Sequence, residues 1–492
     1  MFRYKYLLSL LRCAAVVLIL GSCKEAGLSD YGVENIWNYG FNTATKTALE
    51  TFYFWHESLP ATITVTEEDP GNFVTRLLYA SDKFSFFRTT DEYYQSNYGI
   101  SSSPIHGFTM GLYKEKVYLT AVYSDSKAME ANLERGYRLI KIGDNVIGID
   151  IALENVGTEI GKNTTNTLTF EKSDGTQVTV TNLAKSEVTR TFIDPVKDEN
   201  GDWQKIKIID EGAKRVGYIQ YNSFSHADRT ELVDALKSLS GVDEFILDLR
   251  YNGGGYLTNA ILLASAIVDS SHLGEESLYL KYNPQYKNTI EKNRFNTSAE
   301  LTALGVTPLN LKRVFILSTS RSASASELVL KILEPFMDVQ HIGTTTYGKP
   351  VGQFVLDTHK SYGYKFYLVT FAVFNKAAYD ASNSLDNSWL YYDGIAPDYE
   401  VGEFRQVTVN INGSNQTMDI LEPFGSEDDP LVAAALSYIT NGSYAKATAS
   451  SDSGFLTAEQ PTGEEPVYMA ENEAEEAFMT SGMFLSPEEM YQ

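Results

Sequence analysis

The sequence predicts a multidomain α/β protein whose largest part contains a mostly parallel sheet. From Arg215 onward, apolar β-branched runs alternate with amphipathic helical patterns, first as a strand over 215–224 and a helix over 227–241. A second apolar run, 244–249, leads through three glycines into an apolar helical segment. Alternation of this kind is typical of parallel sheets with helical crossovers. The length of 492 residues leaves room for further domains around this part.

The composition is that of an ordinary globular protein with an acidic surface. Hydrophobic residues make up 43% of the chain and charged residues 21%, as in typical soluble domains. The 64 acidic and 40 basic residues give a net charge of −24. This balance argues against nucleic-acid binding, which needs a basic face. It favours a soluble body that stays away from anionic membrane surfaces.

The N-terminus has the pattern of a targeting segment. A short apolar stretch, 14–20, follows a basic start, as in secretory signal peptides, and it is too short to span a membrane. Residues 20–23, Leu-Gly-Ser-Cys, resemble a bacterial lipobox. The resemblance implies a lipoprotein signal peptide over 1–22 and lipidation of Cys23. It places the protein in the bacterial cell envelope, anchored to the outer membrane, with the membrane face left open. Plain secretion with an incidental cysteine is the alternative.

The cysteine content fits this expectation. Cys13 and Cys23 are the two cysteines of the chain, and Cys13 would leave with the signal peptide. The mature chain would therefore have no internal disulfide. No later stretch of the sequence approaches the ~20 continuous apolar residues of a transmembrane helix.

Residues 23–102 are predicted to form an N-terminal helical cap. Aromatic and apolar residues recur at roughly helical spacing between Val33 and Phe54, which indicates an amphipathic helix. We expect this helix to pack on the rest of the chain in a structural role.

Residues 103–190 resemble a PDZ domain. The string HGFTMGLY (106–113) precedes a predicted strand, and a short helix, a glycine turn and another strand follow within 124–147. A hairpin is predicted over 167–181. Tyr137 departs from the pattern, because PDZ domains usually carry Asp at this place.

The PDZ resemblance implies a peptide-binding groove. Such grooves bind an extended peptide by strand addition, and backbone N–H groups hold its free carboxylate. In this chain the implied cradle comprises Gly107, Phe108 and Gly111. A small β domain without a working groove is the alternative.

The stretch 313–353 carries the residues from which chemistry is expected. An apolar run predicts a buried strand, small hydroxyl residues follow, and a helical pattern begins at Glu327. A serine at such a junction lies near a helix N-terminus, where free N–H groups can receive a developing negative charge. Spacing alone does not distinguish a nucleophile from an N-cap, and it does not choose among Ser322, Ser324 and Ser326.

A candidate base follows in the same stretch. Lys349 lies in the turn TYGKP, and Gln353 comes four residues later. A hydroxyl nucleophile needs a base, and a lysine can serve if burial lowers its pKa from ~10.4 towards ~7–8. A solvated lysine in a turn is the alternative.

Together these motifs resemble the carboxyl-terminal processing (tail-specific) protease family of serine peptidases. The string RSASASE (321–327), the Gly-Lys turn and the glutamine carry the resemblance. It implies that Ser324 is the nucleophile, that Lys349 is the general base, and that Gln353 orients the lysine. It also implies a crotonase/ClpP-like α/β catalytic core.

The string LDLRYNGGGYL (247–257) resembles the family's turn beside the nucleophile. The resemblance implies an oxyanion hole formed by the N–H groups of Gly254 and Ala325. The register of the three glycines leaves Gly253 and Gly255 open as alternatives. Losing one such donor typically costs ~3–4 kcal/mol of transition-state stabilisation.

The remaining organisation follows from these motifs. We expect the catalytic domain over 191–405 and a C-terminal helical segment over 406–450. Residues 451–492 contain ten carboxylates and no Lys or Arg, which predicts a disordered, solubilising tail. Regulation or partner binding by the tail is the alternative.

No metal or cofactor is expected. The six histidines form no H-E-x-x-H pair, and the sequence has no C-x-x-C and no G-x-S-x-G motif. A Ser/His/Asp triad assembled in space is the alternative to the lysine dyad, with His341 as its candidate.

The sequence therefore predicts a lipid-anchored serine endopeptidase that cleaves protein or peptide substrates recognised near their C-termini. A catalytically inactive, PDZ-bearing envelope adaptor that binds peptide tails is the first alternative. A crotonase-like enzyme acting on thioesters is the second. The identity of the substrate and the oligomeric state are left open.

Overall fold

The structure is a computed structural model. It describes residues 30–98, 104–189, 191–224, 229–382, 384–411, 414–444, 467–469 and 484–485. The expected signal peptide and the expected lipidation site at Cys23 lie outside the described residues.

The N-terminal region contains helices and leads into a strand of the main body. Its elements are α2 (Asp30–Phe52), η1 (His56–Ser58), α3 (Pro70–Thr75), β1 (Phe86–Thr89) and α4 (Thr90–Tyr98). Helix α3 begins where the Asp69 side chain accepts a hydrogen bond from the N–H of Asn72, with Pro70 in the first turn. Strand β1 pairs antiparallel with β19 (Tyr364–Asn375). The N-terminal region is thus joined to a sheet formed by residues far along the chain.

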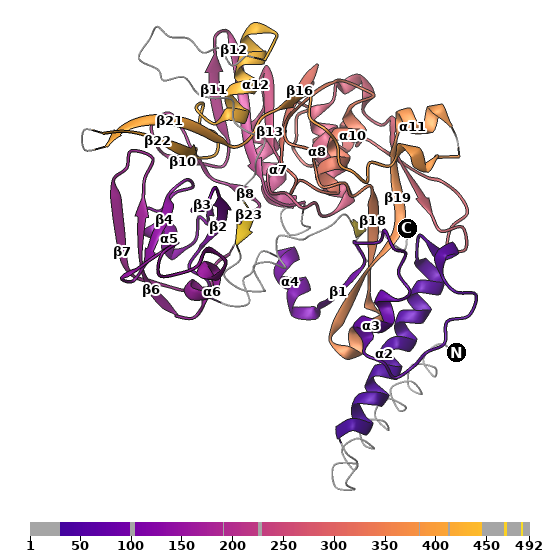
Figure 1. Cartoon of the computed structure of the whole chain (residues 1–492). Coiled ribbons are helices and arrows are strands. Elements are labelled where there is room, and N and C mark those ends of the chain that lie inside the picture. Colours follow the sequence, from indigo (N-terminus) through magenta and orange to yellow (C-terminus); the bar gives the residue numbers. More distant parts are fainter. Residues whose placement is uncertain are drawn as a thin grey trace.

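The region resembling a PDZ domain is an antiparallel sheet with a core of its own. Its elements are β2 (Phe108–Tyr113), β3 (Lys116–Val122), α5 (Lys127–Glu130), β4 (Arg138–Ile142), β5 (Asn145–Val146), η2 (Leu153–Asn155), α6 (Val156–Gly161), β6 (Thr165–Glu171) and β7 (Gln177–Ala184). Phe108, Leu119 and Phe170 are among the apolar side chains buried inside it. In Figure 1 this region lies on the opposite side of the molecule from α2 and α3.

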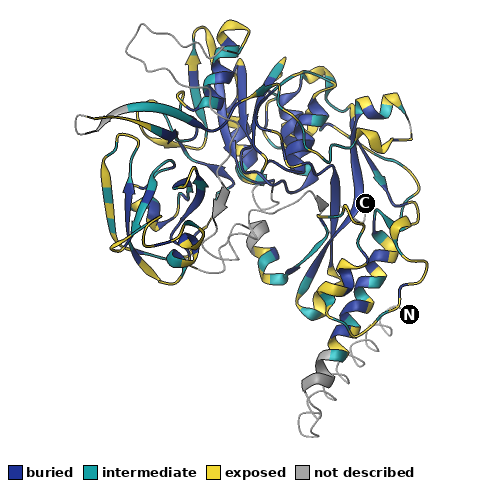
Figure 2. Ribbon diagram, viewed as in Figure 1, coloured by how far each residue is buried: buried dark blue, intermediate teal, exposed yellow. Residues whose placement is uncertain are grey.

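The central sheet carries the strand that precedes Ser324. Its strands are β8 (Ile193–Asp194), β11 (Lys207–Glu211), β12 (Lys214–Tyr221), β13 (Glu244–Asp248), β16 (Arg313–Ser318), β17 (Asp338–Gly343) and β20 (Tyr399–Glu400). Helices α7 (Arg229–Ser238), α8 (Leu257–Ile267) and α10 (Ala325–Leu333) connect them. The successive pairs from β12 through β13, β16 and β17 to β20 are all parallel. Figure 2 shows that buried residues concentrate in these strands and in α8 and α10.

A second sheet carries the strand that follows Lys349. Its strands are β14 (Glu276–Tyr282), β15 (Glu291–Arg294), β18 (Val351–Leu356) and β19, together with β1 and the short β24 (Phe484–Leu485). The flanking short elements are η4 (Ser270–His272), α9 (Ser298–Ala303), η5 (Asp357–Tyr362), α11 (Lys376–Ala381) and η6 (Asn387–Trp389). Strand β18 reaches β19 through η5, and this short connection makes the pair antiparallel.

The expectation of a mostly parallel sheet therefore holds for only part of the protein. Parallel pairing joins β12, β13, β16, β17 and β20, whereas most strand pairs among the described residues are antiparallel. The difference has a simple cause. Parallel strands need long crossovers, and helices α7, α8 and α10 provide or contribute to such crossovers only in the central sheet.

The segment after the central sheet also differs from expectation. Residues 406–450 were expected to be helical, but β21 (Phe404–Ile411) and β22 (Ser414–Leu421) pair antiparallel before α12 (Pro430–Asn441) begins. Residues 405–411, Arg-Gln-Val-Thr-Val-Asn-Ile, alternate polar and β-branched side chains, which favours a strand. Short strands β9 (Val196–Lys197) and β10 (Trp203–Gln204) form a further small antiparallel pair.

Two pieces of the expected tail form strands. Strand β23 (Val467–Met469) pairs with β2, and β24 (Phe484–Leu485) pairs with β18. The rest of 451–492 lies outside the described residues.

Candidate active site

Ser324 occupies the N-cap of α10 in an unusual backbone conformation. Its φ is 61° and its ψ is −108°, and its side chain is fully buried. Positive φ is strained for a residue with a Cβ and costs about 1–3 kcal/mol. Strain of this kind persists only where the surroundings enforce it, and it is concentrated at functional sites. The backbone at Ser324 therefore supports a role beyond capping a helix.

The two neighbouring serines are tied to the backbone of the glycine turn. Ser322 Oγ donates to the carbonyl of Leu249 at 2.9 Å, and Ser326 Oγ donates to the carbonyl of Asn252 at 2.8 Å. These contacts give both hydroxyls a structural role. Neither Ser322 nor Ser326 has the positive φ of Ser324, and this backbone difference distinguishes the three serines in a way that the spacing in the sequence could not.

Lys349 is buried beside a neutral partner. Only 5% of the residue is exposed, and its Nζ donates to Gln353 Oε1 at 2.8 Å. Burial lowers the pKa of Lys349 from 10.5 to about 7, since the ammonium loses its water, and Asp82 opposes this only partly. An amine with this pKa is partly neutral at pH 7 and can accept a proton.

Gln353 is held from the N-terminal region. Its Nε2 donates to the carbonyl of Phe84 at 2.5 Å, which leaves Oε1 facing Lys349. The Lys349 amine also lies 5.6 Å from the centre of the Phe84 ring. Phe84 could not be predicted as a partner of Gln353, because the two are 269 positions apart in the sequence.

Glu327 connects the serine to the lysine turn. Its Oε2 accepts from the N–H of Ser324 at 2.6 Å and from the N–H of Lys349 at 2.9 Å. Its Oε1 accepts from the N–H of Gly348 at 2.7 Å and from the Thr346 hydroxyl at 2.6 Å. Burial raises the pKa of this carboxyl group, while these hydrogen bonds favour its charged form. Glu327 was not predicted as a site residue, although a glutamate three residues after a capping serine is a recognisable signal.

The glycine turn lies against the serine. A Cβ on Gly254 would be 3.0 Å from both Ser324 Cβ and the nitrogen of Ala325, and the φ of Gly254 is +107°. Close approach and backbone conformation therefore both require glycine here. Ala325 is the first residue of α10, so its N–H has no acceptor within the helix. The N–H of Gly254 donates to Asn252 Oδ1 at 2.9 Å, so that donor already has an acceptor in this structure.

His341 lies on β17 and contacts other groups. Its Nε2 is 2.5 Å from Ser318 Oγ, and its Nδ1 is 3.2 Å from the carbonyl of Ala396. Burial lowers the pKa of His341 to about 4. The alternative triad thus has a histidine whose two ring nitrogens both contact groups other than Ser324.

The expected peptide cradle lies on the PDZ-like sheet, apart from Ser324 and Lys349. Gly107 has a φ of +95°, and a Cβ there would meet the side chain of Ser126. Phe108 is buried in the core of this sheet, and Gly111 lies in the middle of β2. In Figure 1, β2 lies on a different part of the molecule from α10, which begins directly after Ser324.

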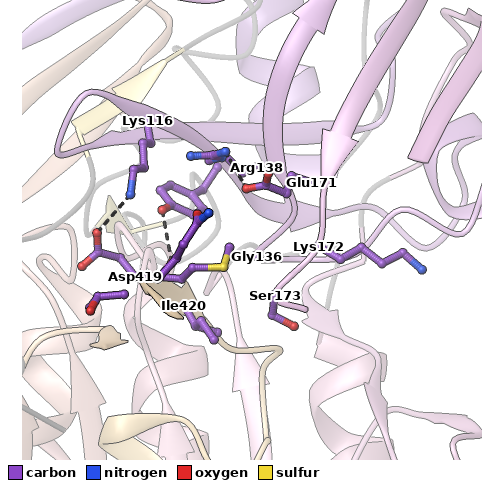
Figure 3. Close-up of a pocket in the computed structure, with 12 residues that line it drawn as sticks. Lys116, Gly136, Arg138, Glu171, Lys172, Ser173, Asp419 and Ile420 are labelled. Carbon is purple, nitrogen blue, oxygen red and sulfur yellow. Dashed lines mark hydrogen bonds and ion pairs between the residues drawn. The ribbon is translucent and has the colours of Figure 1, made fainter. Parts of the chain in front are cut away.

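A pocket of about 90 Å³ lies between the PDZ-like sheet and β22 (Figure 3). It is polar, with an ion pair of 2.5 Å between Arg138 and Glu171 and one of 3.5 Å between Lys116 and Asp419. None of the residues expected to perform chemistry lines it.

In the described part of the chain, no cluster of three or more His, Cys, Asp or Glu side chains could hold a metal ion. Nor does any described helix have the length and apolar character needed to cross a membrane.

Sequence comparisons match this site to a known peptidase family. The model of Peptidase family S41 matches residues 215–401. The carboxyl-terminal-processing protease of Picosynechococcus sp. is 26% identical over 273 residues, which cover 54% of this chain and 58% of that protein. The carboxy-terminal processing protease CtpA of Bacillus subtilis is 33% identical over 138 residues, or 27% of this chain and 26% of that protein. The chloroplastic carboxyl-terminal-processing peptidase 1 of Arabidopsis thaliana is 27% identical over 198 residues, 40% of this chain and 35% of that protein.

Comparison of structures supports the fold. The crystal structure of a candidate S41 protease from Bacteroides fragilis NCTC 9343 matches with a TM-score of 0.62 and 24% identity, covering 80% of this chain and 96% of that one. The chain therefore has a multidomain α/β fold of the kind found in that structure.

Residues 215–401 carry the S41 peptidase match, and the relatives support this family. The matches span 35%, 58% and 26% of the lengths of the first three curated relatives.

Proposed function

We propose that this protein is a serine endopeptidase that cleaves protein or peptide substrates through a dyad of Ser324 and Lys349. The observation that carries the proposal is the buried Lys349 amine, whose pKa is lowered to about 7 and whose contact is the neutral Gln353. The strained backbone of Ser324 and the shared carboxylate of Glu327 support it. The S41 match over 215–401 points to the same reaction class.

In the proposed reaction, the neutral amine of Lys349 removes the proton from Ser324 Oγ. The oxygen attacks the carbonyl carbon of the scissile peptide bond and forms a tetrahedral intermediate. The protonated lysine then gives its proton to the leaving nitrogen as the C–N bond breaks. An ester on Ser324 remains, and a water molecule that gives a proton to Lys349 attacks its carbonyl carbon. The protonated lysine then returns the proton to Ser324 Oγ as the ester C–O bond breaks, which frees the acid product and the enzyme.

The negative oxygen of the intermediate needs hydrogen-bond donors. We propose the N–H of Ala325 as one donor, since it begins α10 and points out of the helix N-terminus. A glycine N–H from 253–255 would supply the second. The N–H of Gly254 would have to leave Asn252 Oδ1 to act as this donor, so its existing hydrogen bond favours Gly253 or Gly255.

We further propose that residues 103–190 act as a PDZ-like domain that recognises substrates near their C-termini. Support comes from the separate apolar core and from strand β2, which follows the Gly107 loop. A crotonase/ClpP-like core over 191–405 would then perform the cleavage. Anchoring through an acylated Cys23 in the bacterial cell envelope completes the proposal, and it is supported by the lipobox-like sequence at 20–23.

The enzymatic proposal is tested on purified residues 24–492 with a fluorophosphonate probe, which reacts with activated serines. We expect mass spectrometry to find the probe on Ser324 and the Ser324→Ala variant to be unlabelled and unable to cleave unfolded protein. Ser320→Ala is a matched control, because Ser320 is an exposed serine of the same loop. Peptide binding without labelling or cleavage in the wild type would favour the adaptor instead.

The anchoring proposal is tested separately by metabolic labelling with a fatty acid analogue. We expect Cys23→Ala to abolish the labelling, because residues 24–492 contain no other cysteine. Labelling that persists in this variant would exclude the lipobox.

A further inference from the structure

The C-terminal tail of the chain is paired with the edge of the PDZ-like sheet. Strand β23 lies antiparallel to β2, with Val467 opposite Leu112, Tyr468 opposite Gly111 and Met469 opposite Met110. The order of strands in this sheet is β23, β2, β3, so β2 would be an edge strand without the tail. An edge strand exposes unpaired N–H and C=O groups that accept an added strand. Figure 1 shows β23, in yellow, beside β2.

The direction of β23 is that of a peptide ligand. Its register moves from Leu112 to Met110 as the tail advances, so the tail runs towards Phe108 and the Gly107 loop. A peptide whose C-terminus is held by that loop would run the same way along β2. The tail thus takes the place and the direction expected of a bound substrate.

The same tail also reaches the strand beside the catalytic dyad. Strand β24 pairs parallel with β18, with Phe484 opposite Gln353 and Leu485 opposite Phe354. It also contacts α8, which begins two residues after Gly255. Strand β24 therefore contacts two elements near the candidate active site. One is β18, whose Gln353 accepts a hydrogen bond from Lys349, and the other is α8, which follows the glycine turn.

We propose that the C-terminal tail is a tethered peptide ligand of its own enzyme, which substrates must displace from β2 and β18. This inference rests on the proposed peptidase function. It identifies the C-terminal tail as the segment that occupies β2 and β18, the strands on which substrates would bind. Backbone pairing of short strands is weak alone, but tethering gives a segment an effective concentration on the order of millimolar. Two paired segments on one tail strengthen the occupancy further, because each holds the other nearby.

Deleting residues 445–492 tests the proposal. We expect the truncated enzyme to cleave an unfolded protein with a KM about 10-fold lower, since no tethered competitor remains. The double variant Val467→Pro/Tyr468→Pro tests the same point in the full chain. Adjacent strand residues point their N–H groups in opposite directions, so one of these prolines removes a donor facing β2. Glu459→Pro/Gln460→Pro, in the tail but outside both paired segments, is the matched control and should leave KM unchanged.

A binding measurement separates this proposal from the chemistry. A synthetic peptide of residues 461–489 is added to the truncated protein carrying Ser324→Ala, and its affinity is measured by calorimetry. We expect binding there and at least 10-fold weaker binding to the full-length Ser324→Ala protein, whatever the outcome for the dyad. Equal KM values for full-length and truncated enzyme, or no binding of the peptide, would overturn the proposal. Loss of the tail from the wild type but not from Ser324→Ala, seen by intact mass, would also overturn it and make the tail a substrate.

Discussion

Arg250 and Lys349 are both buried cations, and their surroundings differ completely. Arg250 contacts Asp248 at 2.5 Å and Asp429 at 2.8 Å, with no exposed surface. Burial alone would lower the pKa of Arg250, but these carboxylates outweigh it and raise the pKa well above its usual value. Lys349 contacts the neutral Gln353, and burial lowers its pKa to about 7. A buried cation with anionic partners keeps its proton and holds those partners together. A buried amine with a neutral partner can lose its proton near pH 7 and is therefore available for proton transfer.

The Arg250 cluster also joins two parts of the protein. Glu403 lies 3.4 Å from Arg250 and 2.5 Å from Arg135 of the PDZ-like region. Arg135 also donates to the Tyr251 hydroxyl at 3.0 Å, and Tyr251 directly precedes the turn that carries Asn252 and the glycines. This cluster therefore fixes the glycine turn relative to the PDZ-like region.

The largest expected effect is on catalysis at the lysine. Lys349→Met keeps a similar apolar length but removes the base, so we expect kcat/KM for peptide cleavage to fall by about 10²–10⁴-fold. Lys349→Arg should not restore it, because guanidinium stays protonated at every accessible pH. Steady-state kinetics measure both variants. Substantial activity in Lys349→Arg would rule out the lysine base and return attention to His341.

The next effect is on stability at the arginine. Arg250→Met leaves Asp248, Asp429 and Glu403 buried without their shared cation, so the free energy of unfolding should fall by about 3–5 kcal/mol. Urea denaturation measures this loss. Lys376→Met is the matched control, because Lys376 forms an exposed pair with Asp380 at 2.8 Å and should give no measurable change. Equal stability of the two variants would mean that the buried cluster does not stabilise the fold.

The same substitution at Lys349 should act on stability in the opposite direction. The pKa of Lys349 is about 10.5 in the unfolded chain and about 7 in the folded protein. As pH falls from about 10.5 to about 7, the unfolded chain therefore takes up a proton that the native state does not, and the native state loses stability. Lys349→Met removes this penalty and should be more stable than the wild type at pH 7 by up to roughly 4 kcal/mol. The advantage should shrink as pH rises from 7 towards 10. A difference in unfolding free energy that is constant between pH 7 and pH 9.5 would contradict the burial of a titrating amine.

A smaller effect is expected at Glu327. Glu327→Gln keeps one acceptor oxygen but places an NH₂ group against at least one backbone N–H donor, so stability should fall by about 1–3 kcal/mol. Because Glu327 connects Ser324 to Lys349, kcat should fall about 10-fold while KM stays unchanged. Kinetics at substrate saturation distinguish this from a general loss of folded protein. A change in KM alone would show that Glu327 does not position the dyad.

Much of the site was predictable because its signals are local. The strand, the small residues and the helix around Ser324 follow one another in the sequence. Lys349 and Gln353 are also close in the sequence, one in the turn and the other in the strand that follows it. In an extended strand, residues four apart share a face but lie about 13 Å apart. The register shift at Gly352 and Gln353 and the length of both side chains allow the observed contact of 2.8 Å.

Other features depended on distant residues and could not be read from the sequence. The carbonyl of Phe84 fixes Gln353, and Glu403 joins Arg135 to Arg250. Strands β23 and β24 are only three and two residues long, so no periodicity marks them. They form by pairing with β2 and β18, which are far away in the chain.

Lys349 is proposed to act as a base for Ser324 at neutral pH. The most direct test is the rate of fluorophosphonate labelling at Ser324 as a function of pH, followed by mass spectrometry in the wild type and in Lys349→Met. The rate in the wild type should rise with pH through a single ionisation near 7, where the buried amine loses its proton. In Lys349→Met that step should disappear and the labelling should be slow at every pH. The same rise near pH 7 in Lys349→Met would show that Lys349 is not the base.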